Sequence, residues 1–222
     1  MNIILVECGI ELIPKEIKNH ASVENNLKKD NFSSQILDNA LHHTAMKRLK
    51  NYQKRGRPDI LHLCLLNALG SPLNLSGNLN IYFHTVQNKI FHLNPKLKIA
   101  RNYNRFKGIM AKLLLEGNIR AGDENLISSI NGNLKQLLKP TPESEIIICS
   151  SKGKLNTDFK ELFSQDLSKN YIIMIGGFQK GNLSPEILCL SNKIVSISEN
   201  PLNAWNVVNK IISLYEIRHD IH

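Results

Sequence analysis

The chain has 222 residues, 42% hydrophobic and 21% charged, with a net charge of +9, which suits a globular protein with one sizeable α/β core. No apolar run approaches the roughly 20 residues that cross a bilayer, and the first residues lack a signal-peptide pattern, so we expect a cytoplasmic protein without membrane association. The cysteines at 8, 64, 149 and 189 form no CxxC pair and no cluster at zinc spacing, which predicts reduced thiols and no bound metal.

The hydrophobic spacing predicts alternating strands and helices. In chain order these are a strand at 2–6, helices at 33–53 and 59–69, strands at 79–85 and 89–93, a helix at 103–116, strands at 145–149, 171–175 and 193–197, and a helix at 202–215. The last three strands are continuous apolar runs, typical of a parallel sheet buried on both faces. We therefore predict an α/β fold with a mostly parallel sheet, helices on both faces, and a linker at 139–142.

The basic residues are concentrated in one segment. Residues 39–115 contain thirteen lysines and arginines and a single acid, Asp59, whereas the rest of the chain has a net charge of −3. Such segregation is expected of a face that binds a polyanion. A solvated face, or a face for an acidic protein partner, would give the same pattern.

Two details within this segment favour RNA. Arg55 and Arg57 flank a glycine just before Pro58, which puts them on a stiff turn. Farther along the chain, cations alternate with aromatic residues, namely Lys98, Arg101, Tyr103, Arg105 and Phe106. Because phosphates attract the cations while unpaired bases stack on aromatic rings, this spacing indicates single-stranded or looped RNA.

Glycines follow the predicted strand at 171–175. Gly176, Gly177 and Gly181 would let the backbone turn tightly and let a ligand approach it, at the carboxyl end of a parallel strand. The spacing matches neither GxGxxG nor a phosphate-binding loop. A tight turn without a ligand is therefore an equal alternative to a nucleotide site.

A second polar turn follows the strand at 193–197 and carries Ser198, Glu199 and Asn200 before Pro201. An ordinary strand-to-helix connection capped by Ser198 or Asn200 is the simpler interpretation. Two such turns at the same edge of the sheet would also form the walls of an adenosine pocket.

Asp59, the only acid of the basic segment, allows three interpretations. It caps the helix that follows, holds Arg57 in one orientation, or accepts a proton in catalysis. A cap is the commonest outcome for such a residue, and it is compatible with holding Arg57.

Several motifs, in one order, resemble a single family over nearly the whole chain. They are RGRPDI at 55–60, SPLN at 71–74, IYFHT at 81–85, NPKLKIARNYNRFKG at 94–108, GGFxxG at 176–181 and SISENPLNA at 196–204. The chain resembles the archaeal type of the pseudouridine-specific ribosomal RNA methyltransferases, which belong to the SPOUT class.

This resemblance implies a single domain over 1–222, with a basic RNA-binding region at about 39–115 and a C-terminal trefoil knot for S-adenosylmethionine at about 143–222. It implies a homodimer that methylates nitrogen 1 of a pseudouridine in a loop of small-subunit ribosomal RNA, with a role in ribosome biogenesis. The site residues that follow are Arg55, Arg57, Lys98, Arg101 and Arg105 for RNA, Asp59 to stabilise Arg57, and, for the cofactor, Gly176, Gly177, Gly181, Ile197, Ser198, Glu199, Asn200, Pro201 and Leu202.

The chain departs from the family pattern in two places. It has Lys98 and Ala100 where the family has arginine and proline, and Gln179-Lys180 where archaeal relatives have Pro-His. Lysine keeps the charge of arginine but loses its bidentate fork. The alternatives to a methyltransferase are a non-catalytic RNA-binding assembly factor with the same fold, and a nucleotide-binding enzyme unrelated to RNA, which leaves the basic segment unexplained.

Overall fold

The structure, a computed structural model, describes residues 1–28, 31–138, 144–166 and 168–222, so the predicted linker at 139–142 lies outside the described residues. In chain order, with η for 3-10 helices, the elements are β1 (Asn2–Cys8), η1 (Lys15–Ile17), α1 (Ala21–Glu24), η2 (Phe32–Gln35), α2 (Asn39–Met46), η3 (Tyr52–Lys54), α3 (Pro58–Leu69), α4 (Pro72–Leu75), β2 (Asn80–Thr85), β3 (Ile90–Leu93), α5 (Tyr103–Glu116), β4 (Asn118–Ala121), β5 (Glu124–Ile130), α6 (Leu134–Leu137), β6 (Ser144–Leu155), α7 (Phe159–Leu162), β7 (Asn170–Gly176), α8 (Pro185–Leu188), β8 (Ile194–Ser196) and α9 (Ala204–His219).

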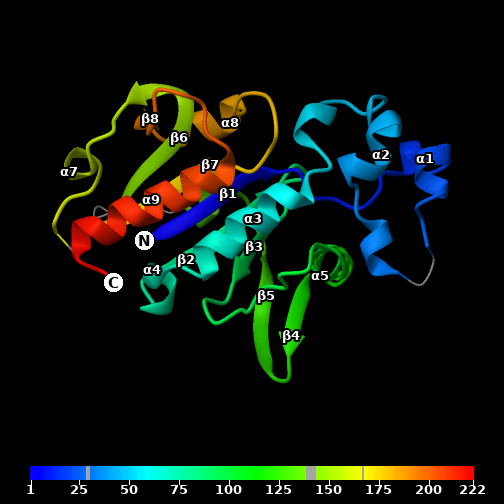
Figure 1. The fold of residues 1–222 in the computed structure, drawn as a ribbon, viewed down its shortest axis with the longest axis horizontal. Helices are drawn as coiled ribbons and strands as arrows, with labels where there is room; N and C mark the ends of the chain where they lie inside the picture. The colour runs from blue at the N-terminus through cyan, green and yellow to red at the C-terminus, as the bar shows by residue number, and fades with distance from the viewer. Residues whose placement is uncertain (29–30, 139–143, 167) are drawn as a thin grey trace.

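The strands form one eight-stranded sheet in the order β4-β5-β3-β2-β1-β7-β6-β8 (Figure 1). The five strands from β2 to β8 in this order pair in parallel, whereas β3, β5 and β4 form an antiparallel end. The mostly parallel sheet predicted from the apolar runs is confirmed. The β4–β5 hairpin was not predicted, because its exposed and polar residues give little hydrophobic signal.

Helices cover both faces of the sheet, as the sequence predicts. Alternate side chains of a strand point to opposite faces. Ile3 and Leu5 of β1 therefore pack into the core under α3, α5 and α9, while Ile4 and Val6 pack into the core under α6 and α8. Figure 1 shows α3 and α9 lying side by side across the sheet.

The long helix predicted at 33–53 is wrong. Ile36 is extended, with φ −81° and ψ 135°, and forms an isolated bridge with Leu12. Asp38 starts a new helix, α2, by accepting a hydrogen bond from the Ala40 backbone N–H at 3.0 Å. Asn51, at φ 54°, ends the segment before η3. Four apolar residues of this segment instead form a small separate core with Ile17 and Val23, namely Leu37, Ala45, Met46 and Leu49.

The helix predicted at 103–116 is confirmed at both ends. Asn102 accepts a hydrogen bond from the Arg105 backbone N–H at 3.0 Å, and Gly117 ends the helix at φ 82°. Asp59 does not cap α3, because Arg57 is the N-cap residue, and the Arg57 side chain makes no capping hydrogen bond. Within the described residues, none of the helices combines the length and apolarity that a bilayer crossing needs.

Candidate active site

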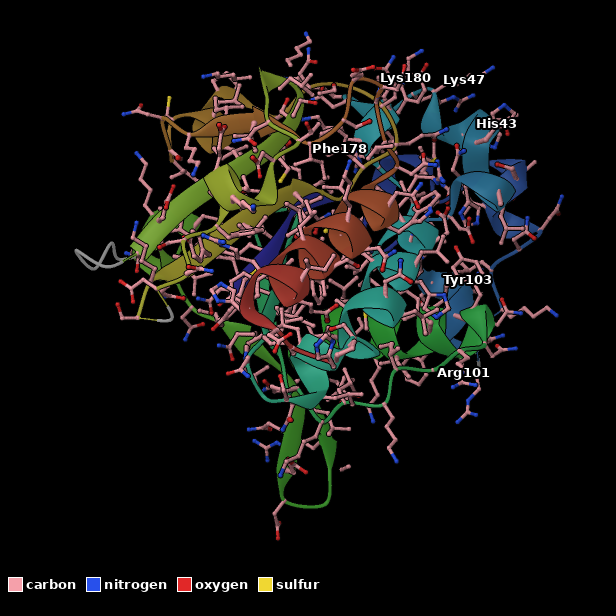
Figure 2. The ribbon with its side chains drawn as sticks, turned by 60° about the vertical axis from the view of Figure 1, so that its left-hand side comes forward. His43, Lys47, Arg101, Tyr103, Phe178 and Lys180 are labelled. Atoms are coloured by element: carbon pink, nitrogen blue, oxygen red, sulfur yellow. The ribbon has the colours of Figure 1, made fainter. Side chains whose placement is uncertain are left out.

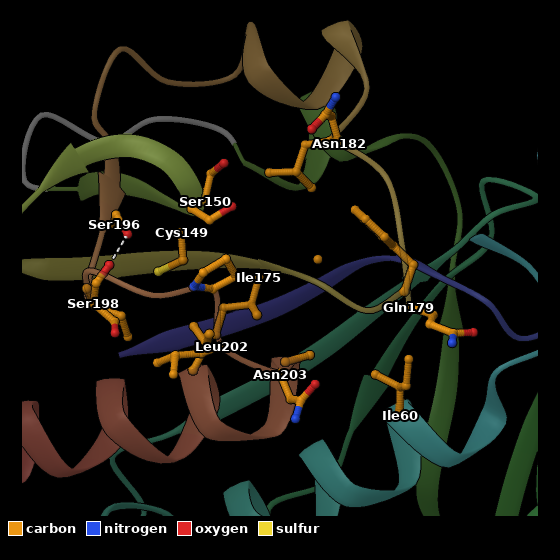
Figure 3. Close-up of a pocket in the computed structure, with 18 of the residues that line it drawn as sticks. Ile60, Cys149, Ser150, Ile175, Gln179, Asn182, Ser196, Ser198, Leu202 and Asn203 are labelled. Carbon is orange, nitrogen blue, oxygen red and sulfur yellow. Dashed lines mark hydrogen bonds between the residues drawn. The ribbon is translucent and has the colours of Figure 1, made fainter. Parts of the chain in front are cut away.

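A cavity of about 490 Å³ opens beside the middle of β6 and at the carboxyl ends of β7 and β8 (Figure 3), within the size range of small-molecule sites. Figure 3 shows Ser150 and Asn182 on one side of it and Leu202 and Asn203 on the other. Its lining comes from Arg57 and Ile60, the middle of β6 at 149–151, the glycine loop at 175–183 apart from Gly177, and residues 195–198, 200–205 and 207. The two polar turns predicted from the sequence are thus brought together.

The three glycines of the loop after β7 have different environments. Gly176 and Gly181 line the cavity, and Gly181 has φ 118°, a conformation that favours glycine. Gly177 instead packs against β1, because a Cβ there would lie 2.4 Å from the Cys8 sulfur. Gly177 therefore shapes the turn, and the structure places it outside the cavity lining that we assigned to it.

The loop after β8 forms the opposite wall. Its predicted residues Ile197, Ser198, Asn200, Pro201 and Leu202 line the cavity, while Glu199 does not. The Ser196 hydroxyl donates to the Ser198 carbonyl at 2.8 Å, and the Lys210 ammonium donates to the Ile197 carbonyl at 2.7 Å. These two bonds fix the shape of the loop.

The alternative that this loop is a simple capped connection is wrong in its detail. Asn203 is the N-cap residue of α9, and its side chain makes no capping hydrogen bond. Neither Ser198 nor Asn200 caps the helix. The polar groups of the turn are therefore not explained by helix capping.

The middle of β6 forms a further wall, which the sequence did not predict. The register between β6 and β8 shifts between Cys149 and Lys154, and this irregularity brings Ser150 and Ser151 to the cavity. Burial raises the pKa of the Cys149 thiol to about 12, so this thiol is neutral and unreactive at physiological pH. The signal that would have found this wall is the carboxyl end of the apolar run at 145–149.

Arg57 joins the cavity to the basic segment. It lines the cavity, and its side chain makes two parallel hydrogen bonds to Asp59, from Nε to Oδ1 at 2.8 Å and from Nη2 to Oδ2 at 2.6 Å. The hydrogen bond to Asp59 is the main cause of a raised Arg57 pKa. This geometry matches the second interpretation of Asp59, in which the carboxylate orients Arg57, and that role stays a prediction.

Three further predicted RNA contacts lie in the first turn of α5 or in the segment just before it. Lys98, Arg101 and Arg105 are exposed, and none of the described residues forms an ion pair with them. Figure 2 shows Arg101 and Tyr103 on the same side of the molecule. These cations are therefore free to meet an anion.

Two aromatic and basic residues of the segment have other roles than expected. Phe106 is fully buried and stacks on His62 with ring centroids 4.4 Å apart, so it is a core residue and the expected stacking on RNA bases is wrong for it. Arg55 is held by buried Glu11 through Nε to Oε1 at 2.7 Å and Nη2 to Oε2 at 2.6 Å. Its Nη1 also donates to the Lys50 carbonyl at 3.4 Å, so Arg55 fixes the loop that carries Arg57 and uses three of its nitrogens to do so.

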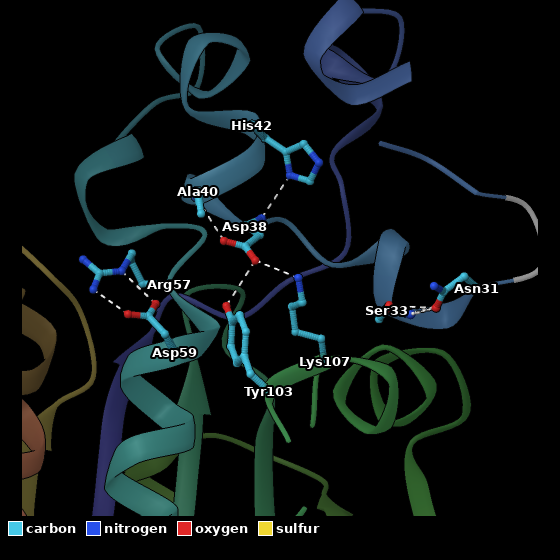
Figure 4. A network of polar contacts seen from close by, with 9 residues as sticks. All are labelled: Asn31, Ser33, Asp38, Ala40, His42, Arg57, Asp59, Tyr103 and Lys107. Atoms are coloured by element: carbon cyan, nitrogen blue, oxygen red, sulfur yellow. Dashed lines mark hydrogen bonds and ion pairs between the residues drawn. The ribbon is translucent and has the colours of Figure 1, made fainter. Parts of the chain in front are cut away.

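Tyr103 belongs to a buried network that holds α5 against α2 (Figure 4). The Asp38 carboxylate accepts hydrogen bonds from the Tyr103 hydroxyl at 3.1 Å and from the Lys107 ammonium at 2.9 Å. Burial, followed by the negative charges of Asp38 and Asp59, raises the pKa of the Tyr103 hydroxyl, so it stays protonated. The network therefore fixes the start of α5 relative to α2. Arg105 lies in the first turn of α5, and Arg101 lies just before it.

The cavity fits a ligand with a flat apolar part and polar edges. Apolar side chains from two opposite walls line it, namely Ile175 and Leu183 from the glycine loop and Ile197 and Leu202 from the loop after β8. Within the described part of the chain, no backbone N–H of residues 178–183 donates a hydrogen bond to another group, which leaves these donors for a ligand. Arg57 and Lys180 are the charged side chains of the described lining. These properties suit a nucleoside with polar groups attached.

Comparison with known proteins agrees with this geometry. Residues 3–216 match the model of the EMG1/NEP1 methyltransferase family. The chain belongs to this family. It is 39% identical over 215 residues to a protein of Staphylothermus marinus named ribosomal RNA small subunit methyltransferase Nep1, covering 96% of this chain and 93% of that protein. A protein of the same name from Saccharolobus solfataricus is 42% identical over 217 residues, covering 96% and 95%.

A crystal structure of Archaeoglobus fulgidus Nep1 bound to S-adenosylhomocysteine has the same fold. Its TM-score is 0.84 at 32% identity, and the match covers 98% of this chain and 97% of that one. This confirms the family and the SPOUT fold class expected from the sequence motifs, whose C-terminal part the resemblance implies to be knotted. In this EMG1/NEP1 member, the glycine loop and the turn after β8 are the two motifs that meet at the cavity.

Proposed function

We propose that this protein transfers a methyl group from S-adenosylmethionine to nitrogen 1 of a pseudouridine in a loop of small-subunit ribosomal RNA, in the cytoplasm and during ribosome biogenesis. The observation that carries the proposal is the position of Arg57, which lines the cavity and also belongs to the basic segment at 39–115. The names of the relatives and the S-adenosylhomocysteine bound to the Archaeoglobus fulgidus protein support it.

The residues of the cavity fit this cofactor. The apolar side chains of Ile175, Leu183 and Leu202 would pack against the adenine, and the free N–H groups of the glycine loop would bind its polar groups. We assign cofactor contacts to Gly176, Gly181 and the cavity-lining part of the turn after β8, and keep Gly177 and Glu199 as residues that shape these turns. When bound, the cofactor supplies a methyl group already activated by its sulfonium.

The remaining chemistry needs alignment and charge. The acceptor is a weakly acidic ring N–H whose proton would pass to solvent water, with S-adenosylhomocysteine as the leaving group, and a fixed positive charge stabilises the anion that develops. Arg57 supplies that charge at the edge of the cavity, and Asp59 fixes the direction of its guanidinium. Because both oxygens of Asp59 already accept hydrogen bonds from Arg57, we assign it an orienting role rather than that of a general base.

For RNA binding we propose phosphate contacts by Arg57, Lys98, Arg101 and Arg105, within a basic region at about 39–115 of a single domain that ends in the cofactor-binding part at about 143–222. Exposure and the lack of ion-pair partners among the described residues support the last three. We also propose a homodimer, as the resemblance implies.

Calorimetric titration with S-adenosylhomocysteine tests the proposal. Binding with one site per chain is expected, and it should be lost when the cavity is blocked. A well-folded protein that binds a pseudouridine-containing hairpin but not S-adenosylhomocysteine would instead be the non-catalytic assembly factor.

A further inference from the structure

The glycine loop is supported from outside the cavity by one lysine. The Lys54 ammonium lies 4.6 Å from the centroid of the Phe178 ring, and its Cε lies 3.5 Å from the position that a Cβ on Gly181 would occupy. Phe178 and Gly181 both line the cavity, whereas Lys54 does not. Lys54 therefore packs on the outer side of the cavity wall.

Glu7 holds Lys54 in this position. Its Oε2 accepts hydrogen bonds from the Lys54 ammonium at 2.7 Å and from the backbone N–H of Ser184, directly after the loop, at 3.4 Å. The side chains of Lys54 and Glu7 are only 20% and 12% exposed, so solvent screens this pair less than a surface pair. Lys54 thus contacts the loop itself, and Glu7 binds the backbone directly after the loop.

The backbone of Glu7 is unusual in a way that serves this contact. Its φ is 53°, a left-handed conformation that is costly for a glutamate, at a shift in the β1–β2 register between Leu5 and Cys8. Its N–H donates to the side-chain Nδ1 of His84 on the neighbouring strand β2, at 3.2 Å, and not to a backbone carbonyl of that strand. Such strain persists where the surrounding contacts impose it, and here it directs the carboxylate to Lys54 and Ser184.

A backbone connection runs parallel to this side-chain support. Gly9 donates its N–H to the Gly177 carbonyl at 3.3 Å and accepts from the Arg57 N–H at 2.8 Å. Lys54 ends η3, three residues before Arg57. The glycine loop and the loop of Arg57 therefore share one anchor at the end of β1.

We propose that Lys54, oriented by Glu7, is a positioning residue of the cofactor site, which holds Phe178 and the Gly181 turn in the conformation that binds the cofactor. The proposal rests on the proposed function, since it assumes that the cavity binds S-adenosylmethionine. The physical reason is that residues 178–183 have no backbone N–H bonds of their own within the described chain, so side-chain contacts must fix this loop. A cation over an aromatic ring at a partly buried site is a contact of sufficient strength.

The first test compares Lys54→Met with a matched control, Lys50→Met, in calorimetric titrations with S-adenosylhomocysteine. Lys50 is an exposed lysine four residues away, without an ion-pair partner among the described residues. We expect about fivefold weaker binding in Lys54→Met, from the usual strength of a cation–π contact, and no change in the control. Lys54→Arg, which keeps a cation over the ring, should retain most of the affinity. Equal affinities in wild type and Lys54→Met would overturn the proposal.

The second test separates positioning from a general loss of stability. In a Phe178→Leu background the Lys54→Met change should have little further effect on affinity, because the ring that Lys54 contacts is gone. In the ligand-free protein, Lys54→Met should speed amide hydrogen exchange at Gly177 and Ser184, the two hydrogen-bonded amides that flank the loop, while the unfolding midpoint stays close to that of Lys50→Met. Unaltered exchange at these two amides, or full additivity with Phe178→Leu, would contradict the inference. Failure of the wild type to bind S-adenosylhomocysteine would contradict the proposed function, while the exchange measurement would still decide the role of Lys54.

Discussion

Arg57 and Asp59 form a bidentate ion pair across Pro58, with the guanidinium 19% and the carboxylate 37% exposed. The proline restricts the backbone between them, and α3 begins there, so the pair is short-range and rigid. Since Arg57 also lines the cavity, this pair fixes a positive charge where the proposed acceptor nucleotide meets the cofactor site.

Replacing either member of this pair should weaken RNA binding. Arg57→Ala and Asp59→Asn are each expected to lower the affinity for a pseudouridine-containing hairpin by about fivefold, or roughly 1 kcal/mol, and the double mutant should be less than additive. Fluorescence anisotropy titrations give these affinities. A variant Asp59→Asn with unchanged RNA affinity and slow single-turnover methyl transfer would point to a general base and contradict the orienting role.

Substitutions in the glycine loop should separate binding from folding. Gly181→Val puts a β-branched residue at φ 118°, which distorts the cavity wall, so affinity for S-adenosylhomocysteine should fall by more than tenfold while RNA affinity without cofactor stays nearly intact. Gly177→Ala should mainly lower the unfolding midpoint, because its Cβ would meet the Cys8 sulfur at 2.4 Å. Calorimetry and thermal unfolding distinguish the two. A folded Gly181→Val protein with wild-type affinity would mean that the cavity is not the cofactor site.

The buried pair of Asp38 and Lys107 should matter for stability more than any surface pair. Their side chains are 6% and 7% exposed, and removing one partner leaves a buried charge without compensation. Lys107→Met is expected to lower the free energy of unfolding by about 3–5 kcal/mol in urea titrations. The exposed i,i+4 pair of Lys112 with Glu116 offers a control, for which Lys112→Met should cost under about 1 kcal/mol. Equal losses would mean that the network of Figure 4 does not hold α5 in place.

Acidification should destabilise the protein through His42. Burial is the main cause of its lowered pKa, and its Nδ1 accepts the Asp38 backbone N–H at 3.0 Å, which requires the neutral ring. Because the folded-state pKa lies below the unfolded value near 6.5, the unfolded state binds the proton first. Stability is then full above about pH 6.5 and falls as the pH drops, by at most about 1.4 kcal/mol per pH unit for each proton. Urea titrations from pH 7.5 to 5 should show a shallower decline for His42→Asn than for wild type. Identical pH profiles of the two proteins would show that His42 does not cause the decline in stability.

RNA affinity should depend on salt as expected for a few phosphate contacts. Four contacts to a single-stranded loop, from Arg57, Lys98, Arg101 and Arg105, give a slope of about −3 in a plot of log affinity against log salt concentration. Arg101→Ala and Arg105→Ala should each flatten this slope by about 0.7. Titrations over a range of salt concentrations give the slopes, with Lys112→Ala as the control. A pseudouridine-containing hairpin should also compete better than a duplex of equal length. Equal competition by the duplex, together with unaltered slopes, would assign the basic segment to another partner.

The sequence correctly predicted those elements whose capping residues and apolar spacing agree with their contacts in the folded protein. The helix at 103–116 has a capping asparagine and a terminal glycine, and its apolar stripe of Phe106, Met110 and Leu114 is the face buried in the core. The helix predicted at 33–53 had the same spacing. There, Asp38 and Asn51 favour a cap and a left-handed turn, and the contact of Ile36 with Leu12, distant in sequence, decides the extended backbone.

The sequence predicted the parts of the site that are backbone turns and glycines. It did not predict the parts whose position depends on side-chain packing. The glycine loop and the turn after β8 were found because both follow apolar runs, at the carboxyl edge of the sheet. The inward direction of Phe106, the buried partner of Arg55 and the register shift of β6 depend on contacts across the fold. Spacing along a single chain does not contain that information.

Methyl transfer to a defined RNA is the most direct test of the proposed pseudouridine methylation. The purified protein is incubated with S-adenosylmethionine and two hairpins of the small-subunit ribosomal RNA, one with pseudouridine and one with uridine at the same loop position, and the nucleosides are analysed by mass spectrometry. We expect one added methyl group per hairpin, on the pseudouridine only, and a strongly reduced rate in Arg57→Ala. Binding of both cofactor and hairpin without any methylated nucleoside, or equal methylation of the uridine hairpin, would contradict it.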